Sequence, residues 1–366
     1  MSRRAGIHEV AAAAGVSIGT VDRALHGRRG ISEATQRHVI RAAEKLGYRP
    51  NLAARALSGK KKRIRIAVCI PREIHYFYDQ LWAGVYAEAE RWADFGVEFE
   101  HHPLKELGSR EHVVLDKIVH SAPDGIVLTP GHPELASELI TRAESQGIRV
   151  VCVSTDAPAS RRSGIVCVDP LLNGALAGEL MAKFVQPGSS VAAVTGMLSA
   201  EDHARKTEGF TRSFFQHCPQ GSMVGVVEAH EHKQESFQRT KELLARFDSL
   251  AGIYVNTVNC LPVCDALIAC KMMGKVKLIT TDLFREMVPY LKDGTIAASI
   301  YQHPYQQGRL AVGALAQHLV QGVAIPRRRH INPGVVFSSN LHLFREVQES
   351  VGPGLQSSGS GEQEEY

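Results

Sequence analysis

From residue 64 onward, short apolar runs alternate with longer amphipathic stretches, and this alternation constrains the fold more than any other feature. The runs are IRIAVCI (64–70), GIVLT (125–129), RVVCVS (149–154), SVAAVT (190–195), GIYV (252–255) and KLITT (277–281). Stretches with helical spacing are expected at 80–92, 134–146, 202–215, 261–271 and 284–291. Continuous apolar strands between helices are typical of parallel sheets covered on both faces. There are too many units for one small sheet, so the pattern predicts an α/β body of two doubly wound lobes.

The first 65 residues differ from this body in charge. They contain 15 Lys and Arg against 4 Asp and Glu, a balance of +11, whereas the rest of the 366-residue chain holds 27 against 34, a balance of −7. A basic head on a mildly acidic body indicates that only the head meets a polyanion such as DNA. A merely solvated basic surface is the alternative that charge alone leaves open.

Two short helices are predicted at the start of this head. The first has apolar residues at i, i+3, i+4 and i+7, and these are Ile7, Val10, Ala11 and Ala14. Gly15 ends it, because glycine tolerates a left-handed backbone. Ser17 can cap a second helix at 18–25, in which Val21 and Leu25 face inward.

A third helix follows the loop HGRRG. Ser32 can cap it, and Gly47 ends it. Its inward face is Val39, Ile40, Ala43 and Leu46. Three short helices with a tight turn between the first two predict an all-α helix-turn-helix domain, whose second helix normally enters the major groove.

The segments IHEVAAAAGVSIGTVDRALHG, ISEATQRHVIRAAEKLGYRPN and AARALSGKK resemble the reader and hinge of the lac-repressor (LacI/GalR) family. The resemblance covers about the first 60 residues without a gap. It implies that Ile18, Gly19 and Arg23 face base edges at the second helix. It also implies phosphate contacts, which set register rather than sequence, from Ser17, Thr20, Ser32, Tyr48 and Asn51.

This reading helix departs from the family pattern. Ile18 and Gly19 replace a polar pair, so Ile18 could touch a thymine methyl and Gly19 reads nothing itself. Asp22 stands where a small hydroxyl residue is usual, and it could accept from cytosine, orient Arg23 or simply lie on the surface. We therefore expect Arg23 to carry most of the discrimination, through guanine O6 and N7.

Residues 51–58 (NLAARALS) are rich in helix formers and precede a basic linker. In the family that the head resembles, two copies of this hinge form helices on the operator and insert a leucine into the minor groove. Leu57 matches that leucine, and such wedging unstacks and bends the DNA. A flexible tether with Leu57 merely packed is the alternative.

Four polar residues follow predicted strands of the body: Asp156, Asn256, Asp282 and Gln302. Ligands of open α/β sheets bind beyond the carboxyl ends of the strands. Carboxylates and amides there suit hydroxyl-rich ligands, which exchange paired hydrogen bonds with them. Each residue alone would more often be a helix cap or a turn residue, but four at equivalent strand ends predict a site.

The body, from about residue 64 to 344, resembles ribose-type periplasmic sugar-binding proteins and the matching sensor domains of LacI-family regulators. The resemblance implies that those four residues hold sugar hydroxyls and that Phe77 and Tyr78 flank the sugar ring. In the segment EDHARKTEGF it implies a basic contact at Lys206, with Arg205 as the alternative. Lysine lacks the planar fork of arginine, and it could favour an acidic or phosphorylated sugar over the expected plain one.

These patterns divide the chain into a helix-turn-helix domain (1–49), a hinge and basic linker (50–63), a sensor domain (64–346) and a disordered tail (347–366). Lobe 1 is expected at about 64–168 and 303–325, and lobe 2 at about 169–302 and 326–346. Crossings between lobes then fall near 168–173, near Gln302 and near 322–326.

Together these features predict a cytoplasmic, non-enzymatic transcription regulator, a probable repressor. It would bind near-palindromic operator DNA as a homodimer or possibly a tetramer, under control of a small sugar-like effector. No catalytic residue, metal or cofactor is assigned, because nucleophile, H-E-x-x-H, dinucleotide and P-loop motifs are missing. No apolar run or signal peptide indicates a membrane. A transport-associated sugar-binding protein and a sugar-acting enzyme are the alternatives.

Overall fold

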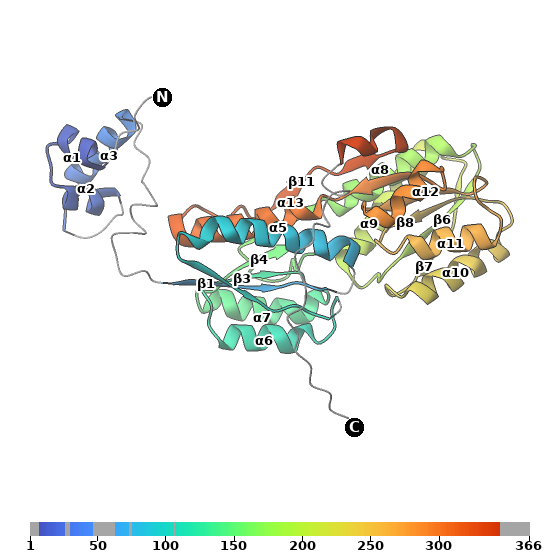
Figure 1. The fold of residues 1–366 in the computed structure, drawn as a ribbon, viewed down its shortest axis with the longest axis horizontal. Coiled ribbons are helices and arrows are strands. Elements are labelled where there is room, and N and C mark those ends of the chain that lie inside the picture. Colours follow the sequence, from blue (N-terminus) through green and yellow to red (C-terminus); the bar gives the residue numbers. More distant parts are fainter. Residues whose placement is uncertain (1–6, 26–29, 47–62, 73–74, 106, 345–366) are drawn as a thin grey trace, which may run out of the picture. The chain divides into compact units, whose positions relative to one another are not determined.

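The computed structural model describes residues 7–25, 30–46, 63–72, 75–105 and 107–344. They form two units, a small helical one that ends at residue 46 and a larger α/β body that begins at residue 64 (Figure 1). The expectations for Tyr48, Asn51, Leu57 and the tail from residue 347 lie outside the described residues.

The helical unit consists of α1 (Ile7–Ala13), α2 (Ile18–Leu25) and α3 (Glu33–Lys45). Val10, Val21 and Val39, one from each helix, are fully buried at its centre. Ser17 Oγ accepts the Thr20 amide at 3.2 Å, so α2 begins with the predicted cap.

The start of α3 also has its predicted cap, because Ser32 Oγ accepts the Thr35 amide at 3.1 Å. The predicted inward face of this helix is wrong at one end. Leu46 is 39% exposed, because it follows the last residue of α3 and no longer shares the buried stripe.

The body contains two six-stranded sheets. The first has the order β11-β5-β4-β3-β1-β2, and the second has the order β12-β10-β9-β8-β6-β7. All neighbouring strands are parallel except β10 and β12. The first sheet comprises β1 (Ile64–Cys69), β2 (Val97–His101), β3 (Gly125–Leu128), β4 (Arg149–Val153), β5 (Gly164–Val168) and β11 (Arg329–Ile331). The second comprises β6 (Ser190–Thr195), β7 (Ser222–Glu228), β8 (Leu250–Val255), β9 (Lys277–Thr281), β10 (Ile296–Tyr301) and β12 (Gly334–Val336).

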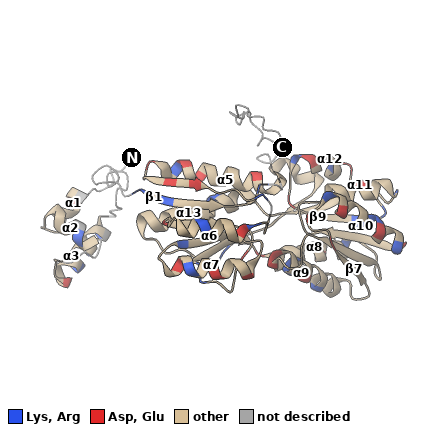
Figure 2. Ribbon diagram, turned by 90° about the horizontal axis from the view of Figure 1, so that it is seen from below, with Lys and Arg blue, Asp and Glu red and all other residues tan. Residues whose placement is uncertain are grey.

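Helices cover both faces of each sheet, as the continuous apolar strands predict (Figure 1). In lobe 1, α5 (His75–Ala93) and α13 (Pro304–Gln321) pack on one face, and α6 (Glu111–His120) and α7 (Pro133–Ser145) on the other. In lobe 2, α8 (Pro170–Phe184) and α9 (Glu201–His217) pack on one face. The other face carries α10 (Lys233–Arg246), α11 (Leu261–Ala269) and α12 (Val288–Lys292). Acidic and basic residues are interspersed along these helices (Figure 2).

Glycine brings α8 and α9 unusually close together. A Cβ atom on Gly174 of α8 would lie 1.9 Å from the carbonyl oxygen of Lys206 on α9. On the opposite helix, a Cβ atom on Gly209 would lie 2.1 Å from the Leu171 carbonyl oxygen. This crossing fixes the height of the α9 backbone at Lys206 and therefore the position of its side chain above the sheet.

The chain passes between the lobes three times. The first two passages lie between β5 and α8 and between β10 and α13, near the expected places. The third lies between Ile331 and Gly334 rather than near 322–326. Residues 326–331 therefore belong to lobe 1, because β11 pairs with β5 at its edge.

Candidate functional site

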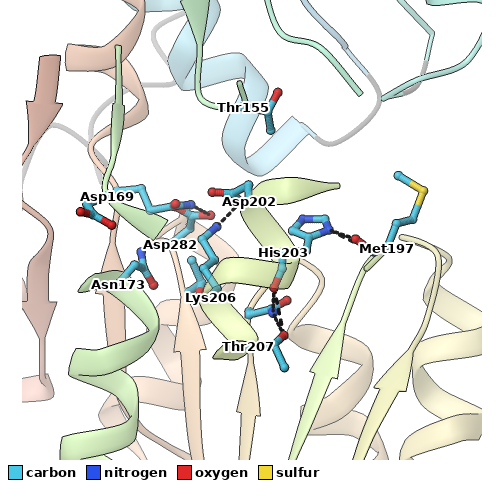
Figure 3. Close-up of polar contacts among 12 residues, drawn as sticks. Thr155, Asp169, Asn173, Met197, Asp202, His203, Lys206, Thr207 and Asp282 are labelled. Atoms are coloured by element: carbon cyan, nitrogen blue, oxygen red, sulfur yellow. Dashed lines mark hydrogen bonds and ion pairs between the residues drawn. The ribbon is translucent and has the colours of Figure 1, made fainter. Parts of the chain in front are cut away.

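A pocket lies between the two lobes, at the carboxyl ends of their strands, where open α/β sheets bind ligands. Its empty space is about 400 Å³. Lobe 1 contributes Phe77, Tyr78, Leu107, Ser154 and Thr155, and lobe 2 contributes Asp202, His203, Lys206, Glu231, Asn256, Thr257, Val258, Asp282 and Gln302. Figure 3 shows Thr155 on one side of the site and Asp202, His203 and Lys206, all from α9, on the other.

The first turn of α9 supplies a buried ion pair. Lys206 Nζ lies 2.6 Å from Asp202 Oδ2, and the two residues are only 2% and 9% exposed (Figure 3). The spacing of four residues puts both side chains on one face of the helix. The ammonium that lines this pocket is therefore already neutralised by a carboxylate of the same helix.

Asp282 follows β9 and is 1% exposed. Gln302, at the end of β10, donates its Nε2 to both oxygens of this carboxylate at 3.0 Å. Gln307 Nε2 donates to the backbone carbonyl of Gln302 at 2.8 Å, which anchors the backbone at this position. Burial raises the pKa of Asp282 to about 7, although nearby Lys206 opposes the shift.

A second carboxyl, Glu231, reaches the pocket from the loop after β7. Burial raises the pKa of Glu231 to about 7. Its backbone has φ of 60° and the preceding His230 has φ of 46°, a left-handed pair that is uncommon outside glycine. A Cβ atom on Gly196 would lie 2.0 Å from Glu231 Oε1, so only glycine leaves room for this carboxyl.

His203 packs beside Glu231, with 3.5 Å between His203 Nε2 and Glu231 Oε1. His203 Nδ1 lies 3.0 Å from the Met197 amide nitrogen and 3.2 Å from the Met197 carbonyl oxygen, so the Met197 backbone offers a partner to either tautomer (Figure 3). Burial lowers the pKa of His203 to about 4. The ring is therefore neutral at pH 7 and adds no positive charge to the pocket.

Asn256 lies at the end of β8 and is fully buried. Its Nδ2 donates to Thr207 Oγ1 at 2.8 Å and to the His203 carbonyl at 3.1 Å. Its Oδ1 has no hydrogen-bond partner among the described residues. A buried acceptor without a partner indicates a place for a donor that the protein does not supply.

Two rings of α5 close the pocket from lobe 1. Phe77 and Tyr78 are each 5% exposed, and their centroids lie 5.2 Å apart at 87°. Burial raises the pKa of the Tyr78 phenol well above its usual value, so it stays protonated. The site therefore combines an apolar wall with polar strand ends, the usual composition of a small-molecule pocket.

The lobes also touch each other directly through α5. Gln80 Nε2 donates to the Leu283 carbonyl of lobe 2 at 2.8 Å, and Tyr301 Oη donates to Gln80 Oε1 at 2.8 Å. Tyr76 stacks on Phe284 with ring centroids 4.0 Å apart. These contacts join the two lobes through α5.

The surface of α2 matches a DNA-reading helix. Ile18 is 42% exposed, and Arg23 is exposed on the same helix. Ser17 and Thr20 hydroxyls lie 2.9 Å apart at its beginning, where a phosphate contact is expected. The Asp22 side chain lies outside the described part of the structure.

Comparison with protein families agrees with both units. The family model for the periplasmic binding protein domain matches residues 66–322, and the model for bacterial regulatory proteins of the lacI family matches residues 6–51. The chain belongs to the periplasmic binding protein family. With the lacI-type domain at its N-terminus it is a LacI-family DNA-binding regulator, which confirms the family resemblance of both segments.

Similar proteins include regulators and binding proteins. Catabolite control protein A of Priestia megaterium is 24% identical over 69% of this chain and 73% of its own length. HTH-type transcriptional regulator DegA of Bacillus subtilis is 26% identical over 57% of this chain and 60% of its own. A solute-binding protein of Burkholderia graminis in complex with D-arabinose is 25% identical, with a TM-score of 0.72, over 77% of this chain and 98% of its own. GanP of Geobacillus stearothermophilus, a glucose-galactose binding protein, is 26% identical, with a TM-score of 0.70, over 76% of this chain and 99% of its own.

Six of the eight ligand contacts expected for this LacI-family sensor line the pocket: Phe77, Tyr78, Lys206, Asn256, Asp282 and Gln302. Asp156 does not. Arg162 binds both of its oxygens, with Nη2 2.6 Å from Oδ2, and turns the carboxylate into a neighbouring cavity. Ser154, in a left-handed turn, and Thr155 line the pocket in its place.

Arg205 does not line the pocket either. It points toward the same neighbouring cavity as Asp156, and its guanidinium lies 4.0 Å from Glu201. Helical geometry is the reason, because adjacent residues lie about 100° apart around a helix. Lys206 is therefore the basic residue that faces the pocket.

The sequence reading missed three titratable pocket residues: Asp202, His203 and Glu231. Asp202 carried a usable signal, since it precedes Lys206 by four residues and shares its helical face. Glu231 carried a weaker signal, because it lies in the loop after β7, whose apolar run (MVGVV, 223–227) is only half-buried. Among the described residues, no group of three or more His, Cys, Asp and Glu is arranged to hold a metal ion. Within the same ranges no helix is both long and apolar enough to cross a membrane.

Proposed function

We propose that this LacI-family regulator is a repressor whose affinity for operator DNA is controlled by a small hydroxyl-rich ligand held between its two lobes. The observation that carries the proposal is the convergence of Asn256, Asp282 and Gln302, from the ends of three neighbouring strands, on one pocket. Their carboxylate and amide groups can exchange several hydrogen bonds with the hydroxyls of one ligand.

The walls of the pocket support a sugar ring as the ligand. Phe77 and Tyr78 offer an apolar surface to the C–H face of a sugar ring, while the strand ends offer polar groups to its hydroxyls. The similar solute-binding protein that holds D-arabinose supports the same ligand class.

The proposed DNA-bound form is a homodimer on a near-palindromic operator, since a two-fold symmetric protein reads two equivalent half-sites. Ligand binding would favour the closed arrangement that the Gln80 contacts stabilise. A ligand that binds only closed lobes shifts the protein toward that state and alters the presentation of the DNA-binding domains.

The experiment uses the full chain. It measures how the ligand changes operator affinity and how the operator changes ligand affinity. Operator sequences are selected from random duplexes, and a panel of pentoses, hexoses and polyols is screened by thermal stabilisation. A ligand at one hundred times its dissociation constant stabilises by about 2.7 kcal/mol. Operator affinity is then measured with and without the ligand, and ligand affinity with and without operator. The two ratios should be equal.

Gln302→Ala should weaken the ligand response, because it removes one of the polar groups that converge on the pocket, whereas Arg205→Met, outside the pocket, should retain it. Operator affinity that stays constant at saturating ligand would contradict the proposal. Sugar binding without DNA selection would instead favour a transport-type binding protein, and turnover of a sugar would favour an enzyme.

A further inference from the structure

The pocket between the lobes has an uneven charge. Among the residues that line it, three are carboxylic acids, Asp202, Glu231 and Asp282, and only Lys206 is permanently basic. His203 is neutral, because burial lowers its pKa to about 4. With every carboxyl ionised, the lining would carry a net charge of −2.

The single lysine is already paired. Its Nζ lies 2.6 Å from Asp202 Oδ2, and both side chains are nearly inaccessible, so one positive and one negative charge cancel within α9. An anionic ligand such as a sugar acid or sugar phosphate would have to displace Asp202 from Lys206. It would also have to approach Glu231 and Asp282. The charges of the pocket therefore disfavour an acidic sugar as the ligand, although Lys206 considered alone would favour one.

Glu231 and Asp282 remain without a cation of their own. Asp282 receives only uncharged donors, from the Gln302 side chain at 3.0 Å and from the Gln302 backbone. Glu231 faces the neutral ring of His203 at 3.5 Å and has a hydrogen bond with Thr257, while its Oε2 has no hydrogen-bond partner among the described residues. Burial raises the pKa of each carboxyl to about 7, although the charge of Lys206, itself paired with Asp202, opposes both shifts.

A separate feature indicates what the missing partner is. Asn256 is fully buried, and its Oδ1 lacks a donor among the described residues although its Nδ2 makes two hydrogen bonds. The same pocket therefore holds an amide oxygen and a carboxylate oxygen that each lack a donor. A hydroxyl donates one hydrogen, whereas an ammonium group donates three and supplies a positive charge.

We propose that the effector is an amino polyol: a hydroxyl-rich molecule, such as an amino sugar, an amino sugar alcohol or an aminocyclitol, that carries a protonated nitrogen. Its ammonium group binds against Glu231, Asp282 and Asn256, and its hydroxyls take the remaining polar positions. This inference rests on the proposed function, because it specifies the ligand class of the same sensor site.

The experiment compares matched ligands on the full chain. Each set contains an amine, its neutral parent and an acid: glucosamine, glucose and glucuronate; galactosamine, galactose and galacturonate; glucamine, sorbitol and gluconate. Thermal shift identifies binders, and calorimetry at pH 7.5 measures their affinity. We expect at least one amine to bind, its neutral parent to bind tenfold or more weakly, and its acid not to bind.

Variants of Glu231 and Asp282 test whether these two carboxyls bind the ammonium group. Glu231→Gln and Asp282→Asn should each narrow the preference for the amine over its neutral parent by about tenfold. Glu208→Gln, an exposed residue of α9 outside the pocket, is the matched control and should leave the preference unchanged. Melting curves without ligand establish that each variant is folded.

The outcomes separate this inference from the proposed function. A neutral sugar that binds as tightly as its amine, or an acid that binds best, overturns the amino-polyol assignment and leaves the sugar-sensing function standing. If no member of any set binds, both the assignment and the hydroxyl-rich ligand class are wrong. An amine preference that Glu231→Gln and Asp282→Asn leave unchanged also overturns it, because the ammonium would then bind elsewhere.

Discussion

Lys206 Nζ and Asp202 Oδ2 lie 2.6 Å apart on the inner face of α9, at the floor of the pocket between the two lobes. The pair is nearly inaccessible to water, so each charge depends on the other for its stability. Because Lys206 is paired with Asp202, the other two carboxyls of the pocket, Glu231 and Asp282, have no basic partner of their own among the residues that line it.

The first prediction concerns this pair. Lys206→Met leaves Asp202 buried without a counter-charge and should lower the free energy of unfolding by about 3–5 kcal/mol. The double variant Lys206→Met, Asp202→Leu should recover most of this loss, because it removes both charges. Urea unfolding at pH 7.5 measures the free energy of unfolding of wild type and of each variant. Arg205→Met, which breaks only an exposed contact, should cost less than about 1 kcal/mol. If Lys206→Met were as stable as wild type, the charges of Lys206 and Asp202 would not stabilise each other.

The second prediction uses Gly196. A Cβ atom there would lie 2.0 Å from Glu231 Oε1 and 2.6 Å from His203 Cε1. Gly196→Ala should therefore displace the Glu231 carboxyl and weaken ligand binding at least tenfold, measured by calorimetry, while operator binding without ligand is retained. Gly225→Ala is the control, because its Cβ would have no neighbour closer than 4.0 Å. Equal ligand affinity in the two variants would show that Glu231 is not part of the site.

The third prediction is a pH dependence of stability without ligand. Burial raises the pKa of Asp282 to about 7, above the value of about 3.9 in an unfolded chain. The folded state therefore holds this proton more tightly, and the carboxyl costs stability progressively as the pH rises from about 4 to 7. Lys206 and Asp202 of α9, Gln302 and Glu231 face this group and modulate the shift.

Asp282→Asn removes that penalty. Its stability relative to wild type should rise between pH 4 and pH 7 and level off above pH 7, as measured by denaturant unfolding at a series of pH values. The comparison with wild type is needed because His203, whose pKa is lowered to about 4, has the opposite pH dependence. Glu208→Gln should give a flat difference over the same range, and a flat difference for Asp282→Asn would show that its carboxyl titrates normally.

The fourth prediction concerns DNA reading. Arg23 is exposed on α2, where Ile18 and Gly19 offer few polar contacts of their own. Arg23→Ala should reduce the preference for operator over random duplex by about 1–3 kcal/mol. Arg37→Ala, exposed on α3, should leave that preference unchanged even if it weakens both affinities. Fluorescence anisotropy at fixed salt measures the two ratios, which must differ between the variants for the interpretation to hold.

Local sequence was sufficient for elements whose signal lies within a few neighbouring residues. The second helix of the reader is predicted at 18–25 and is found there, because Ser17 caps it and its buried residues, Val21 and Ala24, lie on one face. Strands such as β4 and β9 are predicted for a similar reason, since both of their faces are covered and every residue after the first, Arg149 or Lys277, is apolar or small. β7 escaped prediction because it lies at an edge and is half-exposed.

The sequence by itself therefore determined the two-part organisation, the doubly wound lobes and the strand ends that carry Asn256, Asp282 and Gln302. Only the tertiary structure decided which polar groups line the pocket. Asp156 binds Arg162 and does not line the pocket. Lys206 is neutralised by Asp202. Glu231 reaches the pocket from a left-handed turn, where the absence of a side chain at Gly196 leaves room for its carboxyl. The physical reason is that the direction and charge of a buried side chain depend on its partners in space. For Glu231, those partners come from distant parts of the chain.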